Sequence, residues 1–317
     1  MKKIILGRTG IAVTELCFGA LPLGPLQRDA PQDAAAEIIS YGLKAGINFV
    51  DTAQMYGTQQ YIRLAMEKSG IRPVICTKST AKSYEDMQSA VENALRELDV
   101  ETIDIFLLHA ARADDQVLEE ERVDALKCLL DYREKGLIKA VGISTHVIGV
   151  VQSAAKHPEI DIVFPLINRQ GKGVLGGTRE EMEQAIDACY EQDKGVFLMK
   201  VLGGGSLIKD YQNAMDYATA FSRGRFPLAL GMLNQHEVDM NLKYLAGGDI
   251  SEELQYVDEN KKLVLFKGLC TKCGACIAAC HSDAIEMLDA HVGIDQSKCL
   301  NCGYCVSACP QFAIRMA

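Results

Sequence analysis

Two runs of four cysteines near the end of the chain constrain its fold more than any other feature. Each run reads CxxCxxCxxxC, and together they contain Cys270, Cys273, Cys276, Cys280, Cys299, Cys302, Cys305 and Cys309. Every cysteine of the second run follows its counterpart by 29 residues, from Cys270 to Cys299 and from Cys280 to Cys309. The offset extends beyond the cysteines, because Ala284-Ile285-x-Met287 returns as Ala313-Ile314-x-Met316. This internal duplication predicts a pseudo-twofold unit with paired short strands and helices.

The spacing of these cysteines is typical of iron–sulfur ligation. A CxxCxxC loop places three thiolates on one cluster, and the more distant fourth cysteine reaches the other cluster. We therefore expect two 4Fe–4S clusters, one held by Cys270, Cys273, Cys276 and Cys309 and the other by Cys299, Cys302, Cys305 and Cys280. Zinc is the alternative, since CxxC pairs also bind Zn²⁺, but zinc knuckles do not usually contain two such runs in tandem. Residues 262–317 resemble bacterial two-cluster ferredoxins, apart from His281, where the first run would often carry proline.

Composition and charge are those of an ordinary globular protein. Hydrophobic residues make up 48% and charged residues 24% of the 317 residues, and the net charge of −9 argues mildly against a nucleic acid or an anionic membrane as partner. No apolar run approaches the ~18 residues of a membrane span. The short apolar start breaks at Gly7-Arg8, so no export signal is expected. We expect a cytoplasmic protein in which the four scattered cysteines are buried apolar side chains.

Apolar runs alternate with amphipathic stretches before the cysteine-rich segment. The candidate strands are Leu16–Ala20, Ile47–Asp51, Val74–Lys78, Ile103–His109, Ala140–Ser144, Ile162–Asn168, Gly195–Lys200 and Pro227–Met232. Strict strand–helix alternation favours an α/β fold of the (β/α)8 TIM barrel type. A hairpin of Lys3–Leu6 and Ile11–Glu15 is expected to cap its lower end.

The sequence therefore divides into two units. We assign residues 1–257 to the barrel and residues 258–317 to a small α+β ferredoxin-like iron–sulfur domain. Each unit is expected to fold without the other, because each has its own pattern of strands and helices.

Polar residues end several candidate strands, at the rim where barrel enzymes carry their catalytic groups. The stretches that carry a resemblance are Asp51-Thr52-Ala53-x-x-Tyr56-Gly57, Thr77-Lys78, Ile103-Asp104-x-x-Leu107-Leu108-His109 and Gly142-Ile143-Ser144-Thr145-His146. They resemble the aldo-keto reductase superfamily over about residues 1–245. The resemblance implies a catalytic tetrad of Asp51, Tyr56, Lys78 and His109 and the reduction of an aldehyde or ketone by NADPH. Taken alone, Lys78 or His109 would more often be a surface residue, or a residue with satisfied hydrogen bonds, than a catalytic residue.

Elementary chemistry agrees with those roles. A carbonyl that accepts hydride needs a proton donor, and Tyr56 can be that donor, although a free phenol has a pKa near ~10. Lowering this pKa by two units takes roughly 2.7 kcal/mol. An ammonium about 4 Å away offers roughly 4 kcal/mol at an effective dielectric constant of ~20, so Lys78 alone would suffice. Asp51 would hold Lys78 charged and in place, and His109 would orient the carbonyl.

The same resemblance implies which residues bind the nicotinamide cofactor, NADP(H) or NAD(H). The expected cofactor contacts are Ser144, Asn168, Gly203, Glu237 and Asn241. Ser144 and Asn168 would hold the nicotinamide amide, and the glycines after Leu202 would admit the pyrophosphate by close backbone approach. Met199 departs from the family, which often has a stacking aromatic residue there. Glu237 would repel a 2′-phosphate but could bond a free ribose hydroxyl, or it could be an exposed helix residue.

The leading interpretation is a reductase barrel fused to a ferredoxin tail that serves electron transfer or redox sensing. Nicotinamide moves two electrons as hydride, whereas the clusters move one at a time, and no flavin-binding pattern is present in the sequence. The clusters could be structural or sense redox state, or a flavoprotein or ferredoxin partner could exchange electrons through the tail. In the alternative function, the chain is an iron–sulfur electron-transfer protein whose barrel no longer uses nicotinamide and binds a substrate or docks a carrier. A small carbonyl compound is the expected substrate of the leading interpretation.

Overall fold

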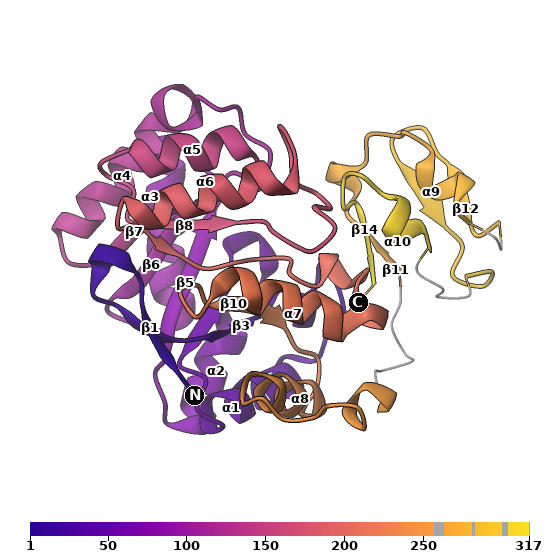
Figure 1. Cartoon of the computed structure of the whole chain (residues 1–317). Coiled ribbons are helices and arrows are strands. Elements are labelled where there is room, and N and C mark those ends of the chain that lie inside the picture. The colour runs from indigo at the N-terminus through magenta and orange to yellow at the C-terminus, as the bar shows by residue number, and fades with distance from the viewer. Residues whose placement is uncertain (257–262, 281–282, 300–303, 317) are drawn as a thin grey trace.

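The structure is a computed structural model that describes residues 1–256, 263–280, 283–299 and 304–316. Within these residues, eight parallel strands form one sheet in the order β10-β3-β4-β5-β6-β7-β8-β9 (Figure 1). The strands are β3 (Leu16–Gly19), β4 (Phe49–Asp51), β5 (Val74–Ser79), β6 (Ile103–His109), β7 (Ile138–Thr145), β8 (Ile162–Pro165), β9 (Gly195–Val196) and β10 (Leu228–Gly231). The sheet closes on itself through a parallel bridge between Leu198 and Leu228, which confirms the predicted barrel.

All eight predicted strands are present, but five of them are shorter than expected, β8 and β9 by the most residues. β8 ends at Pro165 and β9 at Val196, and the chain beyond them continues only as isolated bridges, Leu166 with Met199 and Leu198 with Leu228. The segment that follows β9 turns at Lys200, whose φ is 62°. The left-handed backbone of a non-glycine residue ends the extended run and redirects the chain over the rim.

Helices follow the strands and cover the outside of the barrel. They are α1 (Gln32–Lys44), α2 (Gln59–Ser69), α3 (Tyr84–Leu98), α4 (Val123–Glu134), α5 (Ile148–Lys156), α6 (Arg179–Glu191), α7 (Tyr211–Ser222) and α8 (Gln235–Leu245). The start signals read from the sequence are realised. Ser83 caps α3 by accepting from the amide of Asp86, and Thr178 with Glu181 forms a full capping box at α6. No described helix is long or apolar enough to span a membrane.

The lower end of the barrel is closed by the predicted hairpin. β1 (Lys3–Ile5) and β2 (Ala12–Thr14) pair antiparallel around a short 3-10 turn. Leu6 and Val13 from this hairpin are buried in the same apolar cluster as inward-facing residues of the strands, among them Phe49 and Phe197. The hairpin thus seals one end, and the pocket described below opens at the other.

The C-terminal module repeats the same local structure after 29 residues. Its first half contains β11 (Leu263–Leu265), α9 (Ala275–Ala278) and β12 (Ile285–Met287), and its second half contains β13 (Val292–Ile294), α10 (Tyr304–Ala308) and β14 (Ile314–Met316). β11 pairs with β14 and β12 pairs with β13, both antiparallel. Exchanging the halves maps one pair onto the other, so the predicted pseudo-twofold arrangement is present. The domain boundary predicted at 257/258 lies outside the described residues.

The module lies against the barrel, with β14 on the side that faces it (Figure 1). Phe312, just before β14, is 1% exposed and contacts glycines of two barrel loops. A Cβ on Gly173, where φ is +83°, would lie 1.8 Å from the Phe312 ring, and one on Gly204 would lie 3.1 Å from it. The glycine run after Leu202 therefore accommodates the iron–sulfur module itself.

Polar contacts fix the same interface. Arg112 donates from Nη2 to the Gln311 carbonyl at 2.9 Å, and the Lys172 ammonium donates to the carbonyl of Val306. The cations come from barrel loops and the acceptors from the module, so the two units are hydrogen-bonded as well as packed.

Candidate active site

A buried ion pair lies at the rim of the barrel. Lys78 near the end of β5 donates from Nζ to Asp51 Oδ1 at 2.6 Å and to the Thr52 carbonyl at 2.7 Å. The side chains are 1% and 8% exposed, so the ammonium is almost completely removed from water. Burial lowers the pKa of Lys78, but the charges of Asp51, Tyr56 and Cys76 and the hydrogen bond to Asp51 together outweigh it and raise that pKa above the usual value. Lys78 therefore stays charged at neutral pH.

Tyr56 and His109 lie beside this pair. The Lys78 ammonium is 4.8 Å from the centre of the Tyr56 ring, and the rings of Tyr56 and His109 meet edge to face at 5.8 Å. Burial and then the charge of Lys78 keep the pKa of His109 well below its usual value. His109 is consequently a neutral imidazole at pH 7. The structure thus brings the four predicted tetrad residues together.

The expected depression of the Tyr56 pKa is wrong for this structure. Burial raises the pKa of Tyr56, and the attraction of Lys78 opposes this shift without reversing it, because the nearby Asp51 charge raises the pKa as well. The expectation from the sequence included the attraction of the Lys78 ammonium. It included neither the removal of Tyr56 from water nor the charge of Asp51, and both raise the pKa. Tyr56 is therefore a protonated phenol at neutral pH, the form that a proton donor requires.

A pocket opens next to these residues. It has a volume of about 170 Å³, and Asp51, Tyr56 and Phe164 line one part of it. Ile208, Tyr211, Glu237 and Asn241 line another part. The lining of the pocket thus extends from the buried ion pair to the residues predicted for the adenosine end of the cofactor.

The residues predicted to hold the nicotinamide amide behave differently from one another. The Oγ of Ser144 and the Nδ1 of His109 are both buried and lack a hydrogen-bond partner within the described residues, so each can serve a bound molecule. Asn168 is already engaged in a turn: Oδ1 accepts from the amides of Gln170 and Lys172 at 3.2 and 3.0 Å, and Nδ2 donates to the Lys172 carbonyl. Ser144, Asn168 and Gly203 are not among the described residues that line the pocket, although Gly204 and Gly205 are.

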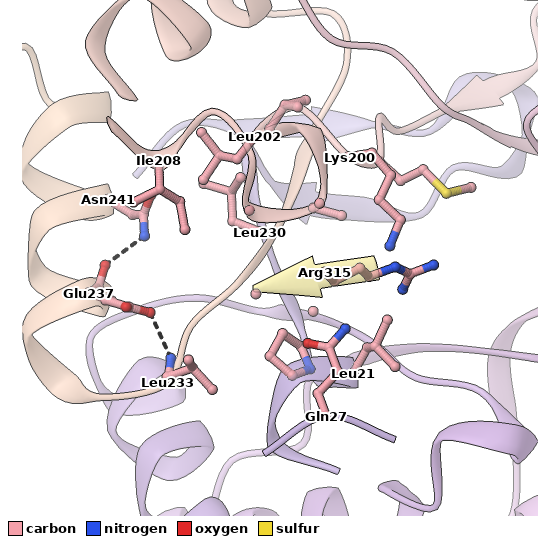
Figure 2. A pocket seen from close by; sticks show the side chains of 18 of the residues that line it. Leu21, Gln27, Lys200, Leu202, Ile208, Leu230, Leu233, Glu237, Asn241 and Arg315 are labelled. Atoms are coloured by element: carbon pink, nitrogen blue, oxygen red, sulfur yellow. Dashed lines mark hydrogen bonds between the residues drawn. The ribbon is translucent and has the colours of Figure 1, made fainter. Parts of the chain in front are cut away.

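Glu237 and Asn241 occupy the predicted adenosine end of the pocket. Asn234 caps α8 by accepting from the Glu237 amide at 2.8 Å, and Oε2 of Glu237 accepts from the Leu233 amide at 2.8 Å (Figure 2). Asn241 donates to the Glu237 carbonyl at 2.6 Å and accepts from the Tyr211 hydroxyl at 2.6 Å. Glu237 is thus a half-buried helix-start residue that also lines the pocket.

A second pocket, in the C-terminal module, gathers one predicted set of cluster ligands. Cys270, Cys273, Cys276 and Cys309 all line it, although Cys309 belongs to the second run. The pairing of β11 with β14 brings the end of the second run beside the start of the first. The four cysteines of this predicted ligand set therefore line one common pocket.

The other predicted set is described in part, because Cys302 lies outside the described residues, as does His281. The duplication is nevertheless visible in the hydrogen bonds to sulfur. The amide of Ala284 donates to Cys280 Sγ and that of Ala313 to Cys309 Sγ, both at 3.3 Å. Such bonds hold a thiolate ligand in place and influence the potential of a bound cluster.

Two cationic residues of the main pocket were missed by sequence reasoning. Lys200 ends the seventh predicted strand, the same kind of position that drew attention to Lys78 and His109, so a signal was available. Arg315 reaches the pocket from the C-terminal module and aligns with Glu286 of the first repeat. The change from a glutamate to an arginine between the two repeats was the sequence feature that could have drawn attention to Arg315.

The fold and this rim define a (β/α)8 barrel of the kind that carries enzyme active sites, and comparison with known proteins identifies the family. Residues 15–263 match the Aldo/keto reductase family, and residues 262–310 match the 4Fe-4S dicluster domain. The chain therefore belongs to the aldo/keto reductase family and carries a C-terminal 4Fe-4S dicluster domain, which confirms the predicted fusion.

Individual relatives are similar over the barrel. The chain is 29% identical over 224 residues to "Probable aldo-keto reductase 1" of Glycine max, covering 65% of this chain and 60% of that protein. It is 30% identical over 167 residues to pyridoxine 4-dehydrogenase of Escherichia coli, covering 47% of this chain and 58% of that protein. The chain thus spans about three fifths of the length of these curated relatives. Aldo-keto reductase AKR11C1 from Bacillus halodurans shares the fold, with a TM-score of 0.63, 21% identity, and coverage of 82% of this chain and 96% of that one.

Proposed function

We propose that this chain reduces an aldehyde or ketone by hydride transfer from NADH or NADPH. The observation that carries the proposal is the Asp51–Lys78 pair beside Tyr56 and His109, at the edge of a pocket that extends to Glu237 and Asn241. The nicotinamide, when bound, supplies a hydride to the carbonyl carbon, so that the electron pair of the C=O π bond moves to the oxygen.

The residues of the chain handle the oxygen and its proton. Tyr56 is protonated at neutral pH and donates its proton to the developing alkoxide, which yields the alcohol and leaves a tyrosinate. The Lys78 ammonium stabilises that tyrosinate, and Asp51 holds the ammonium in place. His109, a neutral imidazole, donates a hydrogen bond to the same oxygen and orients the carbonyl. Ser144, with its unpartnered buried hydroxyl, would hold the nicotinamide amide.

Of the two nicotinamide cofactors, NADH is favoured by the residue at the adenosine end. The carboxylate of Glu237 lines the pocket there, would repel the dianionic 2′-phosphate of NADPH, and would accept from a free ribose hydroxyl. The C-terminal module would hold two 4Fe–4S clusters, which supply one-electron chemistry for a flavoprotein or ferredoxin partner or for redox sensing.

The test is steady-state reduction of a simple aldehyde by anaerobically purified protein, with NADH and NADPH in turn. Tyr56→Phe keeps the ring and removes the proton, so turnover should fall at least a hundredfold, the lower end of typical acid–base contributions. Tyr190→Phe is the matched control, because Tyr190 is 47% exposed on the outer surface and its ring contacts Phe226. Undiminished turnover of Tyr56→Phe would refute the assignment, whereas iron content should be unchanged in both variants.

The competing function, an electron-transfer protein that no longer uses nicotinamide, is favoured by one observation. The pocket wall carries Met199 and Glu237 in places where the family often has a stacking aromatic residue and a group compatible with the 2′-phosphate. Titration with NADH and NADPH separates the two functions. Absence of binding of both nucleotides, in a protein whose clusters accept electrons from dithionite, would favour the competing function.

A further inference from the structure

Two cations from different domains meet in the main pocket. Lys200 comes from the barrel segment after β9, and Arg315 comes from β14 of the iron–sulfur module. Figure 2 shows the ammonium of Lys200 and the guanidinium of Arg315 near one another in the pocket, away from Glu237 and Asn241. Arg315 is only 6% exposed although it lies more than 50 residues beyond the barrel in sequence.

The packing of Arg315 holds it in this position. Within the described part of the chain, the side chain of Arg315 forms one hydrogen bond, from Nε to the Phe312 carbonyl at 3.2 Å. Its terminal nitrogens therefore remain available to a ligand. Its guanidinium lies 4.0 Å from the centre of the Phe266 ring. Phe312 in turn is buried against Gly173 and Gly204 of the barrel. The docking of the module thus presents a pre-oriented planar donor to the pocket.

No described carboxylate forms an ion pair with either Lys200 or Arg315. Asp51 attracts Lys200 but is already bonded to Lys78 at 2.6 Å. Burial, then Arg315 and Lys78, keep the pKa of Lys200 well below its usual value, and burial lowers that of Arg315 to about 10. The two neighbouring cations, Arg315 buried and Lys200 half-buried, repel each other, and an anionic ligand between them would remove that repulsion.

The place of the two cations indicates which molecule carries the anion. Tyr56, Lys200 and Arg315 line the same pocket, Arg315 and Tyr56 each shift the pKa of the other, and Lys78 and Asp51 both act on the pKa of Lys200. The cations are therefore beside the proton donor, whereas the predicted adenosine end of the pocket lies at Glu237 and Asn241. An anion bound between them belongs to the molecule whose carbonyl is at Tyr56.

We propose that Lys200 and Arg315 together bind the carboxylate of the substrate, so that the preferred substrate is an oxo acid and the iron–sulfur module completes the active site. The planar fork of Arg315 suits a carboxylate, and Lys200 adds a point charge. The inference rests on the proposed function for its chemistry: the oxo acid and NAD(P)H, with the proton of Tyr56, give a hydroxy acid and NAD(P)⁺.

The experiment compares charged and uncharged substrates of equal size in the full-length protein. The pairs are 2-oxobutanoate with 2-butanone and 4-oxobutanoate with butanal, because they place the carboxylate at two distances from the carbonyl. The unaltered chain should favour at least one oxo acid tenfold or more in kcat/KM. Arg315→Met should lower kcat/KM for that acid by 10- to 100-fold and for the uncharged partner by less than threefold, and Arg315→Lys should recover part of the loss.

Arg112→Met is the matched control. Arg112 also bridges the two units, through the Gln311 carbonyl, but it does not line the pocket, so its loss should leave the preference for the oxo acid intact. Equal kcat/KM for charged and uncharged substrates in the unaltered chain would overturn the inference. So would a tenfold weaker Kd for NADH or NADPH in Arg315→Met, because the cations would then bind the cofactor pyrophosphate.

A binding measurement separates this inference from the proposed function. Calorimetry with 4-hydroxybutanoate and 2-hydroxybutanoate, the reduced products, reports carboxylate binding without turnover. Binding that depends on Arg315, in a protein that reduces no carbonyl with either nucleotide, would support the carboxylate site and refute the reductase function. Turnover without any dependence on Arg315 would support the reductase and refute the site.

Discussion

Replacing Asp51 by Asn should both destabilise the barrel and abolish activity, whereas Asp51→Asn combined with Lys78→Met should restore stability without activity. The two charges are 2.6 Å apart, which corresponds to about 6 kcal/mol of attraction at an effective dielectric constant of ~20. Desolvation of both ions offsets most of this energy, since it costs several kcal/mol for each ion. The pair as a whole therefore adds little to the free energy of unfolding.

Removal of one partner changes that balance. In Asp51→Asn the Lys78 ammonium keeps the Thr52 carbonyl but remains buried without a counter-charge. Breaking a buried pair in this way costs about 3–5 kcal/mol. With about 2–4 °C per kcal/mol for a domain of this size, the melting temperature should fall by roughly 6–20 °C.

The assay is a double-mutant cycle by urea and thermal unfolding, with aldehyde reduction measured on each variant. The double variant should lie within about 1.5 kcal/mol of the unaltered chain, because no uncompensated charge remains. It should still be inactive, because no ammonium stabilises the Tyr56 oxygen. Additive losses in the cycle would refute the reasoning about the pair, and an active double variant would refute its catalytic role.

Three further outcomes are expected. Cys280→Ala should damage the cluster otherwise bound by the second cysteine run. Anaerobic iron counting and paramagnetic resonance should then show that Cys280→Ala and Cys273→Ala lose different cluster signals. Loss of the same signal in both variants would contradict the crossed ligand sets. Phe312→Ala should cost about 3–5 kcal/mol of buried packing and loosen the docking of β14 (Ile314–Met316), so oxo-acid reduction should fall while iron content is retained; unchanged kinetics would contradict the composite site. Glu237→Gln should shift the ratio of kcat/KM toward NADPH by about tenfold, equivalent to ~1.4 kcal/mol, and an unchanged ratio would show that the carboxylate does not select the cofactor.

The sequence by itself was sufficient where function depends on local spacing. The CxxCxxC loops define their own geometry, and the 29-residue offset returns unchanged in the strands and helices of the module. The barrel strands were readable because apolar runs and helix caps act over a few residues, as at Ser83 and Thr178. The tetrad side chains were readable because parallel strands bring their carboxyl ends to one rim.

Only the tertiary structure decided what depends on burial and on surfaces distant in sequence. The pKa of Tyr56 is raised because burial and Asp51 outweigh Lys78, and no spacing reveals how much water a phenol loses. Asn168 is engaged in its own turn, which depends on the path of the loop after β8 (Ile162–Pro165). Arg315 reaches the pocket that Tyr56 lines because Phe312 fits against glycines of the barrel, a match of shapes that exists only once both domains have folded.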